Sequence, residues 1–332
     1  MVNIDKRNSM DIVVVGTGYF TLECCRAILD SGARLTALIS MPVDQLPLNS
    51  ADIKGFAQTH GVSYYEFGDL NSRAAVDVLR HLAPDYILSS WPKILRPEVL
   101  KVPRQYVIGS HPTQLPFNRG RHPLHWLIAQ GSGQTFLSFF RMDEGVDTGD
   151  ILLQLPVQIK PRDTINGLAN KVNKNAYLGM KKLLKILKKN PPYKGKAQNH
   201  SLANYWRKRT PYDVTLDFRM SAQQIARTVR SFSKPYPCAN LIYENKVFKI
   251  LSVQIIRRAL PLKEMQRFEP GKIISIKGDR LTVKAADQLV ELQMSGLVPS
   301  SLKEARYIHP PLKYFNDHFS ELSAQLNTVF SQ

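Results

Sequence analysis

The residues best suited to chemistry lie between positions 106 and 154 of this 332-residue chain. Histidine, arginine, glycine, proline and aspartate follow one another there at short spacings, in two turn-rich stretches at 111–123 and 143–150. His111 stands at the start of the first stretch and Asp147 in the second. A histidine can take up and release a proton near neutral pH, and a nearby carboxylate fixes its tautomer. The two stretches are therefore the candidate site.

Such loops need a scaffold, and the surrounding sequence predicts alternating strands and helices. Continuous apolar runs are typical of buried parallel strands, and periodic stretches between them are typical of helices. We expect strands at 11–16, 34–40, 62–66, 85–89, 135–141 and 151–159, and helices at 19–30, 51–58, 72–82, 124–130 and 164–189. This order predicts an α/β fold with a doubly wound, mostly parallel, Rossmann-like sheet. Such sheets bind ligands at the carboxyl ends of their strands, where the two loops would lie.

Gly16 and Gly18 invite a dinucleotide site, but the pattern around them is incomplete. The dinucleotide fingerprint requires Gly or Ala three residues after the second glycine, where this chain has Thr21. The second strand ends at Ser40 without the acidic residue that would bind a ribose. We therefore interpret the glycines as a tight turn between a strand and a helix, and we expect no NAD binding.

The character of the sequence changes near position 190. From 181 to 209 the chain has ten lysines and arginines and no acidic residue, and Pro191 and Pro192 end the long helix. A helix is then expected at 221–231, followed by short strands with polar turns at 240–243, 247–256, 272–276 and 281–285. We expect a first domain at 1–190, a basic linker at 191–212, and a small antiparallel, OB-like β-barrel domain at 213–332.

The composition narrows the class of protein. The formal net charge of +18 favours an anionic partner such as phosphate, polyglutamate, nucleic acid or an acidic membrane surface, or reflects a basic, solvated surface. Cys24, Cys25 and Cys238 have neither disulfide nor zinc spacing. The first apolar run is too short for a signal peptide or a membrane span. We expect a cytoplasmic protein with no membrane span and no metal site.

Two motifs in the candidate stretches resemble the formyltransferase family that uses 10-formyltetrahydrofolate. The first, at 108–126, reads IGSHPTQLPFNRGRHPLHW, and the second, at 140–151, reads FRMDEGVDTGDI. The family pattern is Asn-x-His, then Leu-Pro and Arg-Gly, then Asp-x-Gly-Asp-Ile at this separation. The resemblance covers essentially the whole chain. It implies an enzyme that transfers a formyl group from 10-formyltetrahydrofolate to a primary amine.

The resemblance also implies roles for single residues. His111 would shuttle the proton or contact the oxyanion that forms as the amine attacks, and Asp147 would be its carboxylate. A turn histidine bonded to the backbone is the alternative for His111, an Asx-turn is the alternative for Asp147, and Asp150 could supply the carboxylate instead.

Further contacts are implied on both sides of this pair, and no metal is required. Arg119, Gly120 and Arg121 would contact an anionic part of the acceptor, or form a turn with solvated arginines. The residues implied to contact the folate are Ser89, Ser90, Trp91, Leu115, Pro116, Asp143, Gly145 and Asp150.

The chain departs from the family at Gly109, where the pattern has Asn. Glycine has no side-chain donor for the oxyanion, and such a donor contributes roughly 3–4 kcal/mol of transition-state stabilisation. We expect another donor to occupy that space. Lys93 is the first candidate, because its long side chain follows the neighbouring strand, and Ser89, Ser90 or Ser110 are the alternatives. A solvated loop lysine is the competing interpretation of Lys93.

The acceptor amine is inferred from finer features. The sequence RGRHPLHW at 119–126 resembles the sugar-nucleotide members more than the methionyl-tRNA members, which have Arg-Gly-Ala at its start. We therefore expect an amino-sugar nucleotide. One alternative is methionyl-tRNA, with the basic stretch on the RNA backbone. Another is a catalytically weak relative that binds folate or an anionic polymer, because Gly109 lacks the amide.

Overall fold

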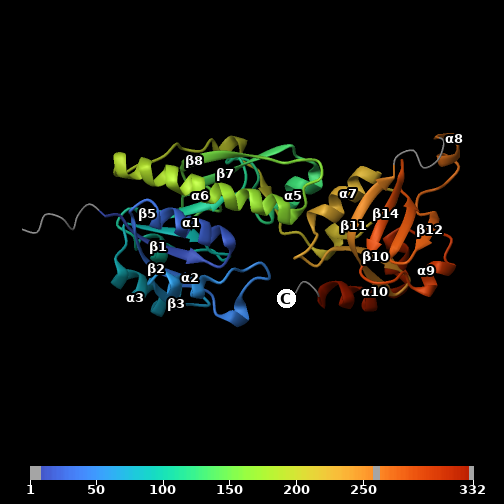
Figure 1. Ribbon diagram of the computed structural model, residues 1–332, viewed down its shortest axis with the longest axis horizontal. Coiled ribbons are helices and arrows are strands. Elements are labelled where there is room, and N and C mark those ends of the chain that lie inside the picture. Colours follow the sequence, from blue (N-terminus) through green and yellow to red (C-terminus); the bar gives the residue numbers. More distant parts are fainter. Residues whose placement is uncertain (1–8, 257–261, 329–332) are drawn as a thin grey trace, which may run out of the picture. The chain divides into compact units, whose positions relative to one another are not determined.

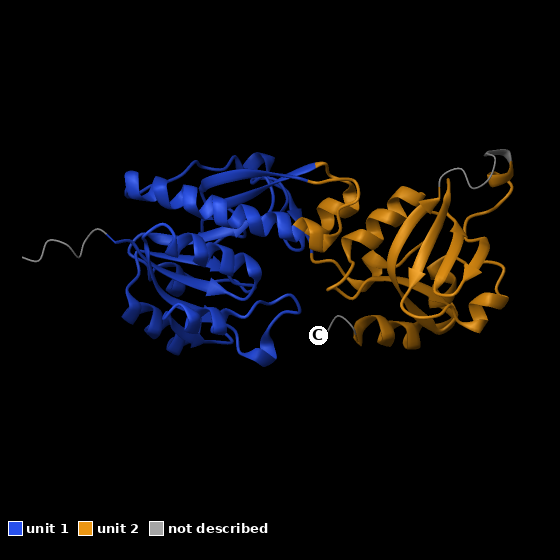
Figure 2. Ribbon diagram, in the orientation of Figure 1, with its two compact units in different colours: residues 1–123, 134–158, 169–207 blue, residues 124–133, 159–168, 208–332 orange. Residues whose placement is uncertain are grey.

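The structure, a computed structural model, describes residues 9–256 and 262–328 and divides into two compact units (Figure 2). Unit 1 takes in the residues up to 123, together with 134–158 and 169–207. Unit 2 takes in 124–133, 159–168 and the residues from 208 on. This division differs from the boundaries expected at 190 and 212, because most of the expected linker groups with unit 1.

Unit 1 is built on a seven-stranded sheet of order β3-β2-β1-β4-β5-β7-β8 (Figure 1). Its strands are β1 Asp11–Gly16, β2 Arg34–Ser40, β3 Ser63–Glu66, β4 Tyr86–Ser90, β5 Tyr106–His111, β7 Gln134–Arg141 and β8 Ile151–Gln158. The first five are parallel, while β7 runs antiparallel to both β5 and β8. The expected doubly wound, mostly parallel sheet is confirmed.

Helices connect these strands. They are α1 Tyr19–Leu29, η1 Val43–Gln45, α2 Ile53–Thr59, α3 Arg73–Leu82, α4 Pro97–Leu100 and α6 Ile165–Lys189, of which residues 165–168 belong to unit 2. The apolar residues of β1 are at most 1% exposed, as expected of a central strand covered on both faces. The register places Ser89 of β4 beside Gly109 of β5, so the carboxyl ends of these two strands meet at one edge.

The glycine turn after β1 has a packing explanation. A Cβ atom on Gly16 would lie 2.2 Å from Oγ of Ser90 and 2.4 Å from Oγ1 of Thr21. The two hydroxyls are 2.7 Å apart and hydrogen-bonded. Gly16 is therefore required by the close approach of α1 to β4, in agreement with our interpretation of a tight turn.

The segment after α6 folds back onto unit 1. Lys196 pairs with Ile151, and a short parallel sheet joins β6 Arg119–Gly120 to β9 Tyr205–Trp206. The 3-10 helix η2 His200–Leu202 lies between these contacts in the sequence. Residues 193–206 therefore hold one of the candidate loops in place.

Unit 2 contains a five-stranded antiparallel sheet of order β10-β11-β14-β13-β12. Its strands are β10 Ala239–Tyr243, β11 Lys246–Ile256, β12 Ile273–Lys277, β13 Arg280–Lys284 and β14 Leu289–Met294. Its helices are α5 Pro123–Gln130, whose first residue belongs to unit 1, η3 Pro211–Val214, α7 Ala222–Ser231, α8 Leu262–Met265, α9 Ser300–Glu304 and α10 Pro311–Thr328. The expected antiparallel arrangement is confirmed, and β14 is an addition to the expected strands.

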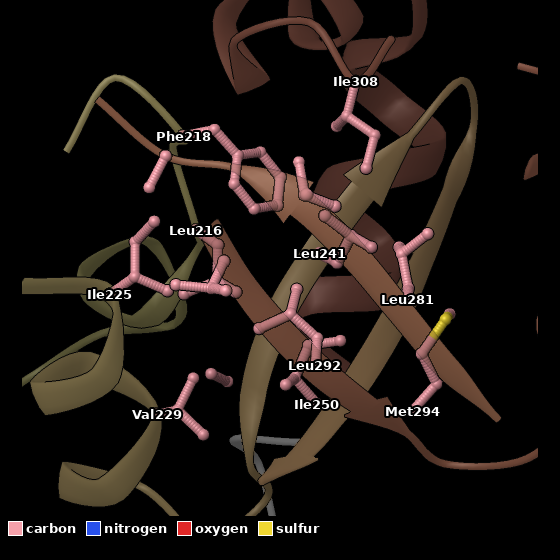
Figure 3. Packing of buried hydrophobic residues seen from close by; sticks show 14 of the residues in the cluster. Leu216, Phe218, Ile225, Val229, Leu241, Ile250, Leu281, Leu292, Met294 and Ile308 are labelled. Carbon is pink, nitrogen blue, oxygen red and sulfur yellow. The ribbon is translucent and has the colours of Figure 1, made fainter. Parts of the chain in front are cut away.

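The core of unit 2 lies between this sheet and α7 (Figure 3). Ile225 and Val229 of α7 meet Leu241, Ile250 and Leu292 of the sheet, all at most 1% exposed. No helix in the described ranges is long and apolar enough to cross a membrane. The described part of the chain also has no group of three His, Cys, Asp or Glu side chains that could hold a metal ion.

Candidate active site

His111 ends β5 at the carboxyl edge of the sheet and is 5% exposed. Its Nε2 lies 2.8 Å from the main-chain oxygen of Asn118, so this nitrogen carries a hydrogen and donates it. Its Nδ1 lies 3.4 Å from Oδ2 of Asp147. The structure therefore brings the expected pair together. It also shows the backbone contact considered as the alternative for His111, so the two interpretations apply to different ring nitrogens.

Asp147 lies in the loop between β7 and β8 and adopts a left-handed backbone with φ of 56°. Its Oδ2 accepts the main-chain N–H of Gly120 at 2.9 Å and also faces His111. Its Oδ1 has no hydrogen-bond partner within 9–256 and 262–328. Asp150, the other candidate carboxylate, contributes a main-chain oxygen to the N–H of Arg141, and its side chain makes no ion pair in the described residues.

The backbone geometry of the loop before α5 requires glycine at position 120. Its φ is 99°, a conformation that favours glycine, and a Cβ atom would lie 2.5 Å from the main-chain oxygen of Trp206. The N–H of Arg121 donates to that same oxygen at 2.9 Å. The loop that presents the Gly120 N–H to Asp147 is therefore held by β9.

Arg119 is buried, which corrects the expectation that it contacts the acceptor. Its side chain is 1% exposed, and its guanidinium donates to the Tyr205 hydroxyl at 2.9 Å and to Oε1 of Gln198 at 2.7 Å. Its Nη2 also lies 3.3 Å from Nδ1 of His200. Arg119 thus ties β6 to the segment after α6. Arg121, by contrast, is exposed.

Gln198 is a site residue that sequence reasoning missed. It is 6% exposed, and its Nε2 donates to the main-chain oxygens of Asp147 at 3.0 Å and Gly149 at 2.6 Å. Its Oε1 accepts from Arg119. One side chain therefore connects both candidate loops. A single glutamine in a polar, basic stretch carries no periodic signal, so residue pattern alone could not have identified it.

The surroundings of Gly109 correct another expectation. A Cβ atom there would lie 2.7 Å from Cζ of Phe140 and 2.8 Å from Cγ of Met142, so these side chains fill the space that we expected a donor to occupy. Lys93 is exposed, and its Nζ donates to the main-chain oxygen of Gly68 at 2.6 Å. The structure does not bring Lys93 to Gly109. Ser110 is half-buried on the same strand.

The residues after β4 offer one unused donor. Trp91 is 9% exposed, and its indole N–H is buried without an acceptor among the described residues. The hydroxyl of Ser90 is hydrogen-bonded to that of Thr21, and the hydroxyl of Ser89 accepts the main-chain N–H of Trp91 at 3.4 Å. The indole N–H is therefore a group that a ligand at this edge could satisfy.

The remaining expected folate contacts shape the two loops. Leu115 is buried, and its main-chain oxygen accepts from Gln154 at 3.1 Å, while Pro116 follows it half-buried. The carboxylate of Asp143 accepts the N–H of Gly145 at 3.1 Å and the hydroxyl of Thr148. Asp143 and Gly145 thus form a turn beside Asp147.

Comparison with known proteins gives matches over both units. Residues 32–184 match the family described as formyl transferase, and residues 208–297 match the formyl transferase C-terminal domain. The chain is 29% identical over 297 residues to the methionyl-tRNA formyltransferase of Alkaliphilus oremlandii, covering 86% of this chain and 93% of that one.

Two solved structures share the fold. One is WlaRD, a sugar 3N-formyl transferase, in the presence of dTDP and 5-N-formyl-THF, with a TM-score of 0.66 and 17% identity over 87% of this chain and 99% of that one. The other is the methionyl-tRNA formyltransferase of Clostridium thermocellum, with a TM-score of 0.55 and 17% identity over 76% and 95% of the two chains. At these identities the likeness concerns the fold alone.

Proposed function

Because this chain belongs to the formyl transferase family, whose members use 10-formyltetrahydrofolate, we propose that it transfers the formyl group to the amino group of methionyl-tRNA. Formyl transfer from the folate follows from the family, and the acceptor is the step that we propose.

The carboxyl edge of β4 and β5 suits the folate. Trp91 has a buried indole N–H with no acceptor in the part of the chain that the structure describes, and a polar ring of the donor would satisfy it. The half-buried Pro116 adds apolar surface on the loop after β5, where the buried Leu115 supports it. We assign the donor to these residues together with Ser89 and Ser90. The bound donor supplies the formyl carbon.

In this proposal His111 and Asp147 accept the proton that the attacking amine loses. The Nε2–H of His111 is committed to the Asn118 carbonyl, which leaves Nδ1 and the Asp147 carboxylate as the pair that exchanges a proton. The Gly120 N–H occupies Oδ2 of Asp147, so Oδ1 is the oxygen open to the amine. A positioned acid–base pair of this kind contributes a rate factor of about 10²–10⁴.

The proposal that the acceptor is a tRNA rests on one observation, which is the exposed positive charge at the end of α6 and in the residues after it. The sequence from 164 to 212 has no acidic residue. The exposed lysines along the end of α6 and just after it are Lys182, Lys185, Lys188, Lys189, Lys194 and Lys196. Lysines that neutralise backbone phosphates release counterions and favour RNA binding. Arg209 is an exception, since it is buried and donates to Ser231 and to the Asp213 main-chain oxygen. The 26–29% identity to several methionyl-tRNA formyltransferases adds support.

The experiment is a competition between acceptors. The protein and 10-formyltetrahydrofolate are incubated with methionyl-tRNA, with alanyl-tRNA, or with a dTDP-linked amino sugar, and formylated product is measured by mass spectrometry. We expect formyl-methionyl-tRNA and little product from the other two. Product from the amino sugar alone would overturn the proposed acceptor, and folate binding without any product would favour a weakly catalytic relative.

An amino-sugar nucleotide is the second candidate, and the exposed Arg121 is the observation that favours it. An exposed guanidinium can bind a diphosphate with two parallel hydrogen bonds. The burial of Arg119 weakens this interpretation, because half of the Arg-Gly-Arg sequence that suggested it is explained by contacts inside unit 1.

A further inference from the structure

One face of α7 carries arginines that do not pack into the hydrophobic core of unit 2. Figure 3 shows Ile225 and Val229 of α7 pointing into the hydrophobic cluster. Gln223, Arg227 and Arg230 follow one another at spacings of four and three residues, which places them together on another face of the helix. Their side chains are half-buried, so this face is neither core nor fully solvated surface.

Two adjoining cavities lie at this face within unit 2. The larger has a volume of about 810 Å³ and is lined in part by Arg162 and by residues 251–255 of β11. The smaller has a volume of about 110 Å³ and includes Arg227. The residues that line both cavities are Pro161, Gln223 and Arg230. The cavities therefore gather three guanidinium groups from two segments of unit 2.

Hydrogen bonds and ion pairs do not account for these guanidinium groups within the described residues. In the described ranges, none of the side chains of Arg162, Arg227 and Arg230 makes a hydrogen bond or an ion pair, and Nε of Arg230 is buried with nothing to donate to. A buried donor left unsatisfied is costly. Burial, and then the charge of Arg227, lower the pKa of Arg230 below its ordinary value. Arg227 and Arg230 thus lie close together, and no carboxylate among the described residues is paired with either of them.

The other charged groups at the cavities do not balance them. Among the described lining residues the carboxylate is that of Asp163, whose Oδ2 accepts the main-chain N–H of Lys160 at 2.8 Å. Lys160 itself adds a further positive charge to the smaller cavity. The net charge of the lining is therefore positive.

The backbone also holds Arg227 in place. Gly131 has φ of 77°, and a Cβ atom there would lie 2.2 Å from Cζ of Arg227. The guanidinium therefore rests directly on the main chain of Gly131, in space that any larger residue would occupy. This contact restricts the arginine before any ligand arrives, which reduces the entropy lost on binding.

We propose that Arg162, Arg227 and Arg230 form a binding site for a phosphate group in unit 2. Guanidinium groups bind phosphate oxygens with paired, charge-assisted hydrogen bonds, and a phosphate would satisfy Nε of Arg230 and neutralise the repulsion between Arg227 and Arg230. Gln223 can donate a further hydrogen bond from its amide. The larger cavity has room for the group that carries the phosphate, whether an RNA backbone or a small phosphorylated molecule. The site does not depend on the acceptor proposed above.

Binding of two probes tests the site without an activity assay. Inorganic pyrophosphate and a short RNA hairpin are each titrated into the full chain and into the variant Arg227→Gln/Arg230→Gln. We expect the variant to lose about tenfold or more in affinity for at least one probe, because each lost guanidinium removes charge-assisted hydrogen bonds to the phosphate. The control Lys246→Gln/Lys303→Gln removes the same charge from exposed residues that line neither cavity, and it should change affinity less than twofold.

The pattern of losses identifies the source of the phosphate. Loss for the hairpin alone assigns the site to RNA backbone, and loss for pyrophosphate alone assigns it to a small phosphorylated molecule. Equal affinities of the variant and the control for both probes, or no binding of either probe to the unaltered chain, would overturn the site. The single variant Arg227→Gln, which leaves Arg230 in place, repeats the test if the double variant does not fold.

Discussion

Asp147 serves two contacts with one carboxylate, the Gly120 N–H and Nδ1 of His111. The variant Asp147→Asn keeps an oxygen that can accept from Gly120, so the loop should hold its shape, but an amide does not take up the proton of the amine. We expect turnover to fall about a hundredfold with little change in the unfolding midpoint. Glu144→Gln, which removes the same charge from an exposed residue of the same loop, should turn over at nearly the normal rate. Near-normal turnover of Asp147→Asn would remove the pair from the mechanism.

A substitution at Gly109 tests whether the space beside this glycine, where the family pattern has asparagine, is empty. Because Phe140 and Met142 would lie within 3 Å of a new Cβ atom, Gly109→Ala should destabilise the protein by about 1–3 kcal/mol, the usual range for overpacking. Gly133→Ala is a matched control, since nothing lies within 4 Å of the Cβ position there. The measurement is the free energy of unfolding in urea. Equal stability of the two variants would mean that the pocket beside Gly109 is open.

Lys93 can be judged by a separate substitution. Its ammonium group bonds to the Gly68 main-chain oxygen and the residue is exposed, so Lys93→Met should leave turnover within about threefold of normal, as expected of an exposed side chain away from the reacting atoms. A hundredfold loss in a steady-state formyl-transfer assay would restore Lys93 as the replacement donor.

The segment after α6 positions both catalytic loops through Gln198. The variant Gln198→Glu keeps an acceptor for Arg119, but it places a carboxylate oxygen against the main-chain oxygens of Asp147 and Gly149. We expect it to lose turnover about tenfold and stability by about 1–3 kcal/mol, the cost of unsatisfied buried groups. Asn199→Ala, at the exposed neighbouring residue, should change turnover little. If Gln198→Glu lost stability alone, Gln198 would hold the fold and not the site.

The elements that the sequence predicted well are those that carry a local signal. The buried strands β1 and β4 each contain a continuous apolar run, at 12–15 and 86–88, and this local pattern was sufficient to predict them. The spacing of the motifs placed His111 and Asp147 together. The strand β14 was missed, although Val290, Leu292 and Met294 alternate with polar residues.

Long-range contacts were beyond such patterns. The parallel pairing of β6 with β9 joins residues far apart in the sequence. No local pattern could therefore predict that the expected linker folds back onto unit 1. The contacts between β6 and β9 also explain Arg119. An arginine in a turn-rich stretch is expected at the surface, but β9 and the residues before it bury this one. The packing of Phe140 and Met142 against Gly109 is another such contact, and it decides against an open space beside that glycine.

The net charge of +18 is a property of the whole molecule. The salt dependence of KM for methionyl-tRNA can show whether part of this charge binds the RNA. Lys185, Lys188 and Lys189 are exposed near the end of α6. Changing all three to Gln should raise KM for methionyl-tRNA and flatten its dependence on KCl concentration, by up to about one unit of logarithmic slope per lost phosphate contact. A control variant with Lys54, Lys101 and Lys277 changed to Gln removes the same charge from exposed positions elsewhere and should keep the slope.

Helix stability must be separated from RNA binding in this experiment. Lysines in the last turn of a helix also stabilise it through the helix dipole, by about 0.3–1 kcal/mol. The unfolding midpoint of the triple variant is therefore measured beside its KM, and kcat should stay near normal because none of the three lysines contacts His111 or Asp147. A slope that flattens equally in the control would assign the effect to net charge. An unchanged slope in both variants would remove the end of α6 from the acceptor site, and with it the observation on which the tRNA proposal rests.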